Sequence, residues 1–191
     1  MKHRLAIFLF TLLPLAGQNY EPLTVEERAK WFVRSTYGVR SLLVSGPITS
    51  AWRTQRNRPV EWGSHWDGFG KRYGARLINN TVTNGIEVSA GAIWNEDPRY
   101  FRLGTGSGGR RVGHALKLTF MSRYGDGEYH LGAAKAIGIT GASFLQKVGM
   151  PDSVTSNRDC TVRIGSNYAG RFVGNFFREF GPDIKKKFKK K

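Results

Sequence analysis

The sequence is poor in cysteine, histidine and acidic residues. Its one cysteine, Cys160, cannot form an intramolecular disulfide, so a packed core must supply the stability. His65, His114 and His130 lack the H-x-x-x-H spacing of a zinc site, and no C-x-x-C occurs. We therefore expect neither a metal nor a cofactor. After the first 17 residues no run of about 18 apolar residues is present, which excludes an obvious membrane-spanning helix.

The first 17 residues have the layout of a secretory signal peptide. Lys2 and Arg4 form a basic start, an apolar run of about nine residues follows, and small residues precede Gln18. A helix needs about twenty apolar residues to cross a bilayer, so this run is too short for a permanent anchor. The sequence predicts export to the periplasm or cell envelope, with a single domain over residues 18–184.

Positive charge dominates the composition. The chain has 30 Lys and Arg residues against 14 Asp and Glu residues, a formal net charge of +16 at pH 7. Six lysines surround Phe188 at the end of the chain, and like charges repel, so we expect a disordered tail over residues 185–191. A basic tail with an aromatic ring also suits an anionic surface. The expected anion-binding residues of this tail are Lys185, Lys186, Lys187, Lys189, Lys190 and Lys191.

Two helices are predicted near the start of the domain. Thr24 and Glu27 have the spacing of a capping box, in which each side chain satisfies a free backbone N–H of the other. This pattern predicts a helix over residues 25–37. Pro47 can open a helix and Pro59 cannot continue one, so a short helix is expected between them.

Residues 71–98 are open to two interpretations. Apolar and small residues recur there with the period of a helix, which favours one long helix. Residues 86–94 also alternate like a strand, and Asn84-Gly85 is a hairpin signal, as is Asp126-Gly127 further on. An antiparallel β-barrel of the outer membrane therefore stays open as the alternative fold.

The C-terminal third favours helices. Apolar residues recur at helical spacing in residues 110–120, 130–151 and 162–180, and Gly181-Pro182 is expected to end the last helix. The predicted fold is therefore mainly α, a single-domain helical bundle with a glycine-rich loop over residues 102–110.

Small residues recur four positions apart in these predicted helices. A glycine in a helix costs about 1 kcal/mol relative to alanine, so the spacing needs a compensating contact. Close approach of a neighbouring helix supplies one, and we expect Gly/Ala-rich packing seams; the alternative is that the stripes pair copies of the chain in a homo-oligomer. The pairs are Gly70 and Gly74, Gly132 and Ala136, Gly165 and Ala169, and Gly170 and Gly174.

Four short segments have a distinctive composition, namely EWGSHWDGFGKRYGARL, NEDPRYFRLG, GMPDS and REFGPDI. In this order they resemble blocks in a group of uncharacterised exported bacterial proteins. The resemblance covers about residues 59–184 and implies an exported, mainly helical domain. It carries over no catalytic residue, because no chemistry is attached to these blocks.

Two of these segments combine carboxylates with aromatic and basic residues. His65 and Asp67 lie in HWD, and Glu96 and Asp97 lie in NEDPRYFR. They are the catalytic candidates for an exported hydrolase that acts on an anionic envelope substrate, for which two opposed carboxylates would be needed. No cysteine-hydrolase signature surrounds Cys160 and no G-x-S-x-G is present, so the sequence leans away from an enzyme.

The stretch GTGSGGRR, residues 104–111, matches the pattern G-x-G-x-x-G. A dinucleotide-binding loop follows a buried strand, but the preceding NEDPRYFRL is charged and broken by proline. We therefore interpret the stretch as a connector to a helix that starts near Arg110. Arg110 and Arg111, beside free glycine N–H groups, are expected to bind an envelope phosphate.

These features favour a basic, non-enzymatic envelope protein, peripheral to a membrane, whose partner is an anionic lipid surface or an envelope polymer. An exported hydrolase and an outer-membrane barrel are the alternatives. No specific nucleic acid is predicted as a partner.

Overall fold

The chain folds mainly into α-helices, as predicted, with one two-stranded sheet among residues 20–189. The computed structural model describes residues 20–189, so the predicted signal peptide lies outside the described residues. The α-helices are α1 (Val25–Tyr37), α2 (Gly46–Gln55), α3 (Trp66–Ile93), α4 (Gly108–Phe120), α5 (Ala133–Leu145) and α6 (Asn157–Lys189). The shorter elements are the π-helix η1 (Arg40–Ser45), the 3-10 helices η2 (Val60–Trp62), η3 (Gln146–Gly149) and η4 (Asp152–Val154), and the strands β1 (Met121–Arg123) and β2 (Tyr129–Leu131).

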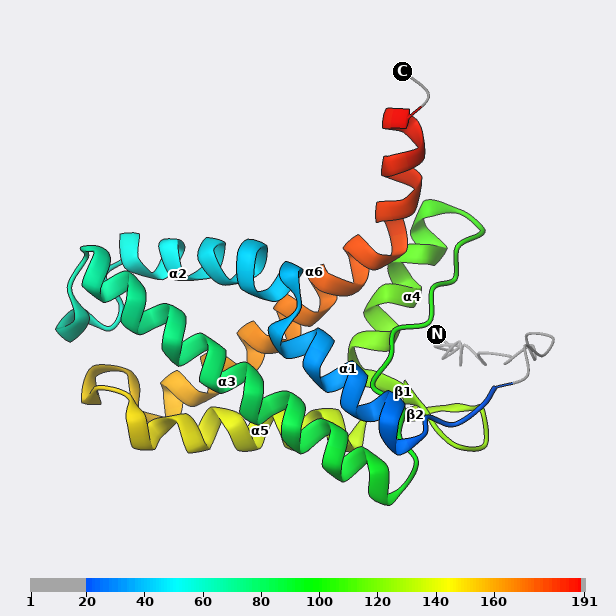
Figure 1. Ribbon diagram of the computed structural model, residues 1–191, viewed down its shortest axis with the longest axis horizontal. Coiled ribbons are helices and arrows are strands. Elements are labelled where there is room, and N and C mark those ends of the chain that lie inside the picture. The colour runs from blue at the N-terminus through cyan, green and yellow to red at the C-terminus, as the bar shows by residue number, and fades with distance from the viewer. Residues whose placement is uncertain (1–19, 190–191) are drawn as a thin grey trace, which may run out of the picture.

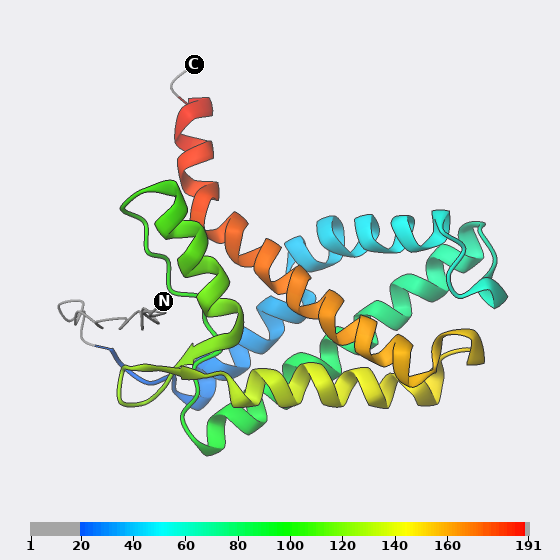
Figure 2. The same ribbon diagram turned by 180° about the vertical axis from the view of Figure 1, so that it is seen from behind.

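α3 is the helix on which α1, α2 and α5 pack (Figure 1). α6 contacts α5 with its first half and α4 further along, and from the opposite side it runs diagonally across the molecule (Figure 2). Within residues 20–189, no helix combines the length and the apolar character that crossing a membrane requires.

The two predicted N-terminal helices are confirmed. α1 begins with the expected capping box: the Glu27 N–H donates to Thr24 Oγ1 at 3.2 Å, and the Thr24 N–H donates to Glu27 Oε2 at 2.9 Å. α2 has Pro47 in its first turn, where a missing N–H costs no hydrogen bond.

α3 continues without a break through Asn84 and Gly85, so the antiparallel interpretation of residues 71–98 is wrong. The reason lies in its neighbours. Asn84 Nδ2 donates to Thr36 Oγ1 of α1 at 3.0 Å, and a Cβ on Gly85 would lie 3.8 Å from the ring of Phe32. Such tertiary contacts outweigh the local preference of Asn-Gly for a turn.

The second hairpin signal is real. β1 and β2 pair antiparallel, with Met121 opposite Leu131, and Asp126 and Gly127 lie in the turn between them. Gly127 has a φ of 83°, a left-handed conformation that glycine adopts without steric cost. Asp126 Oδ1 accepts a hydrogen bond from the Glu128 N–H at 2.9 Å, which closes the turn.

α6 does not end at Gly181-Pro182 but continues through Pro182 to Lys189. The predicted disorder is therefore wrong for residues 185–189, while Lys190 and Lys191 lie outside the described residues. A proline inside a helix removes one N–H and bends the axis, and α6 changes direction near its C-terminal end (Figure 1). In this bend the Glu179 carbonyl accepts from Arg102 Nε at 2.7 Å and Arg111 Nη2 at 2.6 Å, so two side chains from outside α6 hold the bent backbone.

Charged side chains occupy much of the interior. Leu23, Leu118 and Ile139 are the large apolar side chains buried among residues 20–189, whereas several buried side chains are ionic. Arg171 of α6 binds both carboxylate oxygens of the buried Glu87 of α3. The buried Lys135 ammonium donates to the Leu118 carbonyl at 3.0 Å, near the end of α4, and burial lowers its pKa to about 8. Side-chain charges thus satisfy backbone groups and one another across helices.

The predicted packing seams are only partly present. The closest approach is at Gly138 of α5, where an added Cβ would lie 2.7 Å from the Thr83 carbonyl oxygen of α3. Several predicted seam positions contact nothing instead: an added Cβ would find no atom within 4 Å at Gly70, Gly74, Gly165, Gly170 or Gly174. Within the described chain these five glycines do not serve close helix packing.

Two glycine substitutions separate packing from helix propensity. Gly138→Ala should destabilise the fold by about 1–3 kcal/mol, because the new methyl group collides with backbone. Gly165→Ala should stabilise it by about 0.5–1 kcal/mol, because the position is helical and open. Urea denaturation followed by circular dichroism measures both; equal shifts of the same sign would contradict the assigned contact.

Candidate functional site

The glycine-rich loop joins the end of α3 to α4, in line with the connector predicted for GTGSGGRR. Ser107 caps α4 by accepting a hydrogen bond from the Arg110 N–H at 3.4 Å, so the helix begins two residues earlier than expected. Gly104 and Gly106 have φ values of 73° and 94°. These left-handed conformations require glycine and turn the loop toward the C-terminal part of α6.

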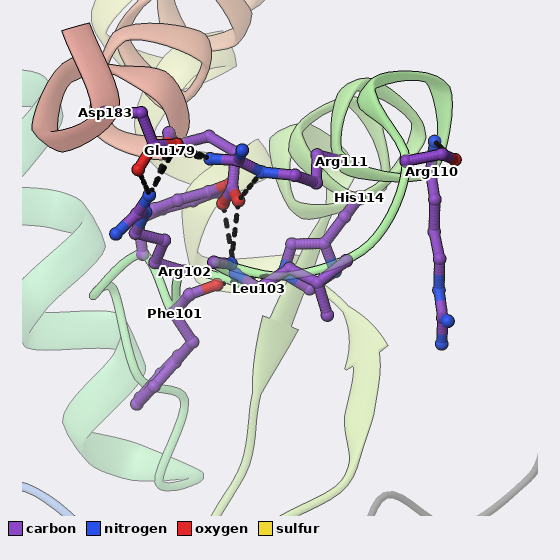
Figure 3. Close-up of polar contacts among 11 residues, drawn as sticks. Phe101, Arg102, Leu103, Arg110, Arg111, His114, Glu179 and Asp183 are labelled. Carbon is purple, nitrogen blue, oxygen red and sulfur yellow. Dashed lines mark hydrogen bonds and ion pairs between the residues drawn. The ribbon is translucent and has the colours of Figure 1, made fainter. Parts of the chain in front are cut away.

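The loop does bind an anion, and that anion is the side chain of Glu179 (Figure 3). The N–H groups of Leu103 and Gly104 donate to its carboxylate at 3.0 and 2.9 Å. Tyr100 Oη donates at 2.7 Å and Arg111 Nε at 2.9 Å. We call these five residues the Glu179 clasp. The clasp is filled from within the chain, and the Glu179 side chain is fully buried.

Arg111 is therefore not free to bind an external phosphate, which corrects the sequence prediction. Its Nη2 also lies 2.6 Å from Asp183 Oδ2, and its guanidinium stacks on the Phe180 ring at 4.3 Å. Arg102 binds both oxygens of Asp183, at 2.8 and 2.9 Å. Arg110 differs from both: its side chain is exposed and points away from the two carboxylates (Figure 3).

The clasp holds Glu179 in its ionised form. Burial by itself would raise the pKa of this carboxyl group, but hydrogen bonds from Arg111, the Gly104 N–H, Tyr100 and the Leu103 N–H outweigh that effect. The pKa of Glu179 falls from 4.5 to about 2. Burial, together with the Glu179 carboxylate, also raises the pKa of the Tyr100 hydroxyl.

Lys185, Lys186, Lys187 and Lys189 lie on the last turns of α6, directly beyond the clasp. Lys185 and Lys186 are exposed, and so is Phe188, with 78% of its surface accessible. The clasp therefore sets the direction in which this basic end of the helix points.

The catalytic candidates do not come together. His65 and Asp67 lie at the first residues of α3, exposed, with Asp67 paired to Lys71 at 2.7 Å. Glu96 and Asp97 follow the other end of α3, and a helix of 28 residues is about 42 Å long. A hydrolytic site that joins His65 or Asp67 to either carboxylate is therefore ruled out by distance.

Glu96 and Asp97 are both buried and saturated with hydrogen bonds. Glu96 Oε2 accepts from the Ala134 N–H at the start of α5, at 2.7 Å, and from Tyr124 Oη at 3.0 Å. Asp97 binds the Arg99 guanidinium, with Nη2 at 2.7 Å from Oδ2. These contacts fix the chain between α3 and α5, and leave neither carboxylate an open position for a substrate.

The residues that sequence reasoning missed are Tyr100, Arg102 and Glu179. A signal was present, because Tyr100 and Arg102 belong to NEDPRYFRLG and Glu179 to REFGPDI, two of the segments singled out for their composition. GMPDS and EWGSHWDGFGKRYGARL also meet, since Ser153 Oγ donates to Glu61 Oε2 at 2.7 Å. The four segments therefore form two contacting pairs at distant points of the chain.

Comparison of the chain with protein-family models, with characterised proteins and with solved structures finds no match.

Removing the Glu179 charge should abolish part of the pH dependence of the free energy of unfolding. Because the folded pKa is depressed to about 2, Glu179 stabilises the fold fully above its ordinary pKa of 4.5 and loses this contribution as the pH falls toward 2. Glu179→Gln should cost about 3 kcal/mol at pH 7 and approach the parent stability near pH 2.

Urea denaturation between pH 2 and 7 is the measurement, with Asp183→Asn as the matched control. Asp183 has a side chain that is 39% exposed, so its substitution should cost less at pH 7. A Glu179→Gln curve parallel to that of the parent over this pH range would refute the role of the clasp.

Proposed function

We propose that this protein is an exported, non-enzymatic component of the cell envelope that binds the surface of an anionic membrane through the outer face of α6. The observation that carries the proposal is an exposed apolar stripe on α6 that runs into the lysines at its end. The stripe consists of Val173, Phe177, Ile184 and Phe188, which are 50%, 49%, 45% and 78% exposed.

The stripe follows one face of the helix. Its members are separated by four, seven and four residues, the spacing that brings side chains onto the same side of an α-helix. α4 and α5 pack on α6 from other directions and leave these side chains uncovered. An apolar face flanked by lysines is typical of helices that lie in the membrane interface.

The end of α6 stands clear of the other helices in both views (Figures 1 and 2). A free helix of fewer than about 12 residues is marginal in water, so a projecting end gains stability from a surface that covers it. The Glu179 clasp fixes the base of this projection and leaves Ile184 and Phe188 exposed. The geometry is that of a preformed arm, which loses less conformational entropy on binding than a disordered tail would.

The positive charge of α6 favours an anionic lipid surface, rather than a second copy of the chain, as the partner of the stripe. Each lysine near an acidic membrane contributes about 1 kcal/mol, and Phe188 can enter the interface between the headgroups. A second copy brings the same charge of +16, so its lysines would repel the first. Exposed residues of α2 add a further apolar and basic surface, where Arg56 stacks on Trp52 at 4.2 Å.

The hydrolase alternative gains no support from the geometry. Its candidate residues lie at opposite ends of α3, and the buried ones are engaged in hydrogen bonds that hold the fold.

Membrane binding should depend on the end of α6 and on salt. In co-sedimentation with vesicles of phosphatidylglycerol and phosphatidylcholine, the parent protein should bind at 50 mM salt and be largely released at 500 mM, because screening shortens the reach of the lysine charges. Lys185→Glu with Lys186→Glu should lower the partition coefficient at least about thirtyfold, and Ile184→Ser with Phe188→Ser at least about tenfold.

The control is Lys30→Glu with Arg34→Glu on α1, two exposed residues whose reversal changes the net charge equally. If both charge-reversed proteins lose vesicle binding equally, net charge alone explains the loss. That result would refute the arm as the binding element. If the protein binds a soluble phosphorylated wall polymer but not vesicles, its partner is the polymer and the proposed membrane binding is refuted.

A further inference from the structure

A second group of basic residues lies far from the lysines, where α2, α3 and α6 approach one another. It consists of Arg53 of α2, Arg72 and Arg76 of α3, and Arg163 of α6. None of these arginines forms an ion pair with a carboxylate in the chain from residue 20 to residue 189. Asp159, one turn before Arg163 on α6, is close enough for their charges to interact, whereas Arg53, Arg72 and Arg76 have no paired carboxylate in the described chain. Like charges gathered without a paired carboxylate are unfavourable.

Three of the four arginines are positioned by backbone carbonyls. Arg72 donates to the Pro59 carbonyl at 2.7 Å and Arg163 to the Ser143 carbonyl at 2.8 Å. Arg76 Nη2 donates to Ser45 Oγ at 2.8 Å, and its Nη1 reaches toward the Ser41 carbonyl. These neutral acceptors hold the guanidinium groups in place but leave their charge uncompensated.

Arg53 is the accessible member of the group. Its side chain is exposed, and within residues 20–189 it forms neither a hydrogen bond nor an ion pair. The surrounding protein lowers the pKa of its guanidinium, and the charges of Arg163, Arg76 and Arg72 lower it further. The Arg53 side chain is accessible to water and lies in the positive potential of these arginines. An anion would be attracted to this position.

Polar atoms without partners collect around the same arginines. In the described chain seven buried side-chain oxygen or nitrogen atoms lack a hydrogen bond, and those of Ser41, Ser50, Asn79 and Gln146 lie in or beside the segments that hold Arg53 and Arg76. Ser50 is the clearest case, because it is only 1% exposed. An unsatisfied buried hydroxyl costs about 1–3 kcal/mol.

Ser50 and Arg53 share a face of α2. Gly46, Ser50 and Arg53 follow one another at intervals of four and three residues, so their side-chain positions line the same side of the helix. That side looks toward α3, since a Cβ on Gly46 would lie 3.2 Å from Arg76 Nη1. The Ser50 hydroxyl is thus a donor without an acceptor on the face of α2 that looks toward Arg76.

We propose that Arg53, Arg76 and Ser50 form a binding site for a phosphate group, with Arg72 and Arg163 adding to the positive field. Guanidinium groups offer paired N–H donors that match phosphate oxygens, and the Ser50 hydroxyl supplies one more donor. The site is separate from the arm on α6 and does not depend on the proposed membrane binding. Its phosphate can come from a lipid headgroup or from a soluble phosphorylated compound.

Calorimetric titration of the full chain with glycerol phosphate tests the site. The parent protein should show saturable binding of one equivalent, and Arg53→Gln should raise the Kd about tenfold, the loss expected for one charge-assisted contact. Arg34→Gln removes an exposed arginine of α1 and should change the Kd less than about twofold. Equal effects of the two substitutions, or no saturable binding, would overturn the site.

Ser50→Ala separates binding from folding. It deletes a hydroxyl that has no partner, so the unliganded protein should unfold at the same or a higher temperature. Its Kd for glycerol phosphate should nevertheless rise about tenfold. An unchanged Kd in Ser50→Ala would refute the role of this residue and the site as proposed.

The two sources of the phosphate are distinguished with vesicles that contain phosphatidylglycerol. If Arg53→Gln also weakens vesicle binding while Arg34→Gln does not, the phosphate belongs to a lipid headgroup. If vesicle binding is unchanged and glycerol phosphate binding is weakened, the ligand is a soluble phosphorylated compound. Failure of the arm on α6 to bind membranes would leave the glycerol phosphate result intact.

Discussion

Buried carboxylates that are hydrogen-bonded on all sides hold this fold together. Glu179 joins the glycine-rich loop, α4 and α6, while Glu96 joins the end of α3 to the start of α5, and Glu87 joins α3 to α6 through Arg171. The apolar core is small, since Leu23, Leu118 and Ile139 are the large apolar side chains buried among residues 20–189. Charge-assisted hydrogen bonds are geometrically demanding, so they fix how the helices sit against one another.

This way of holding the helices leaves apolar side chains on the outside. Val173, Phe177, Ile184 and Phe188 of α6 remain 45–78% exposed, although the Arg40 guanidinium lies 5.8 Å from the Phe177 ring. In water such a surface is unfavourable, and an exposed apolar stripe usually marks a contact with another molecule. The Glu179 clasp and the exposed stripe therefore lie on opposite faces of α6. Glu179 fixes the inner face, and the outer face is available to a partner.

Local signals predicted the helices well where the deciding contacts are close in the sequence. The capping box of Thr24 and Glu27 acts within one turn, and α1 begins there. Asn84-Gly85 carries an equally local signal for a turn, but α3 runs through it because α1 packs against this stretch. Pro182 likewise failed to end α6, since Arg102 and Arg111, more than 70 residues earlier, support the bent backbone. Contacts between residues so far apart in the sequence cannot be predicted from the pattern of neighbouring residues.

By itself the sequence determined the helical class, the positive charge and the position of the glycine-rich loop, because composition and short-range spacing govern all three. Only the tertiary structure decided what the loop does. Its free N–H groups suit an anion, as GTGSGGRR suggested, but the anion is Glu179 from a helix 75 residues away. The same holds for Arg76 of α3, whose guanidinium lies against α2 at Gly46. Packing of the helices determines which distant charges become partners. The interaction energy that favours one partner over another arises only when the helices are packed together.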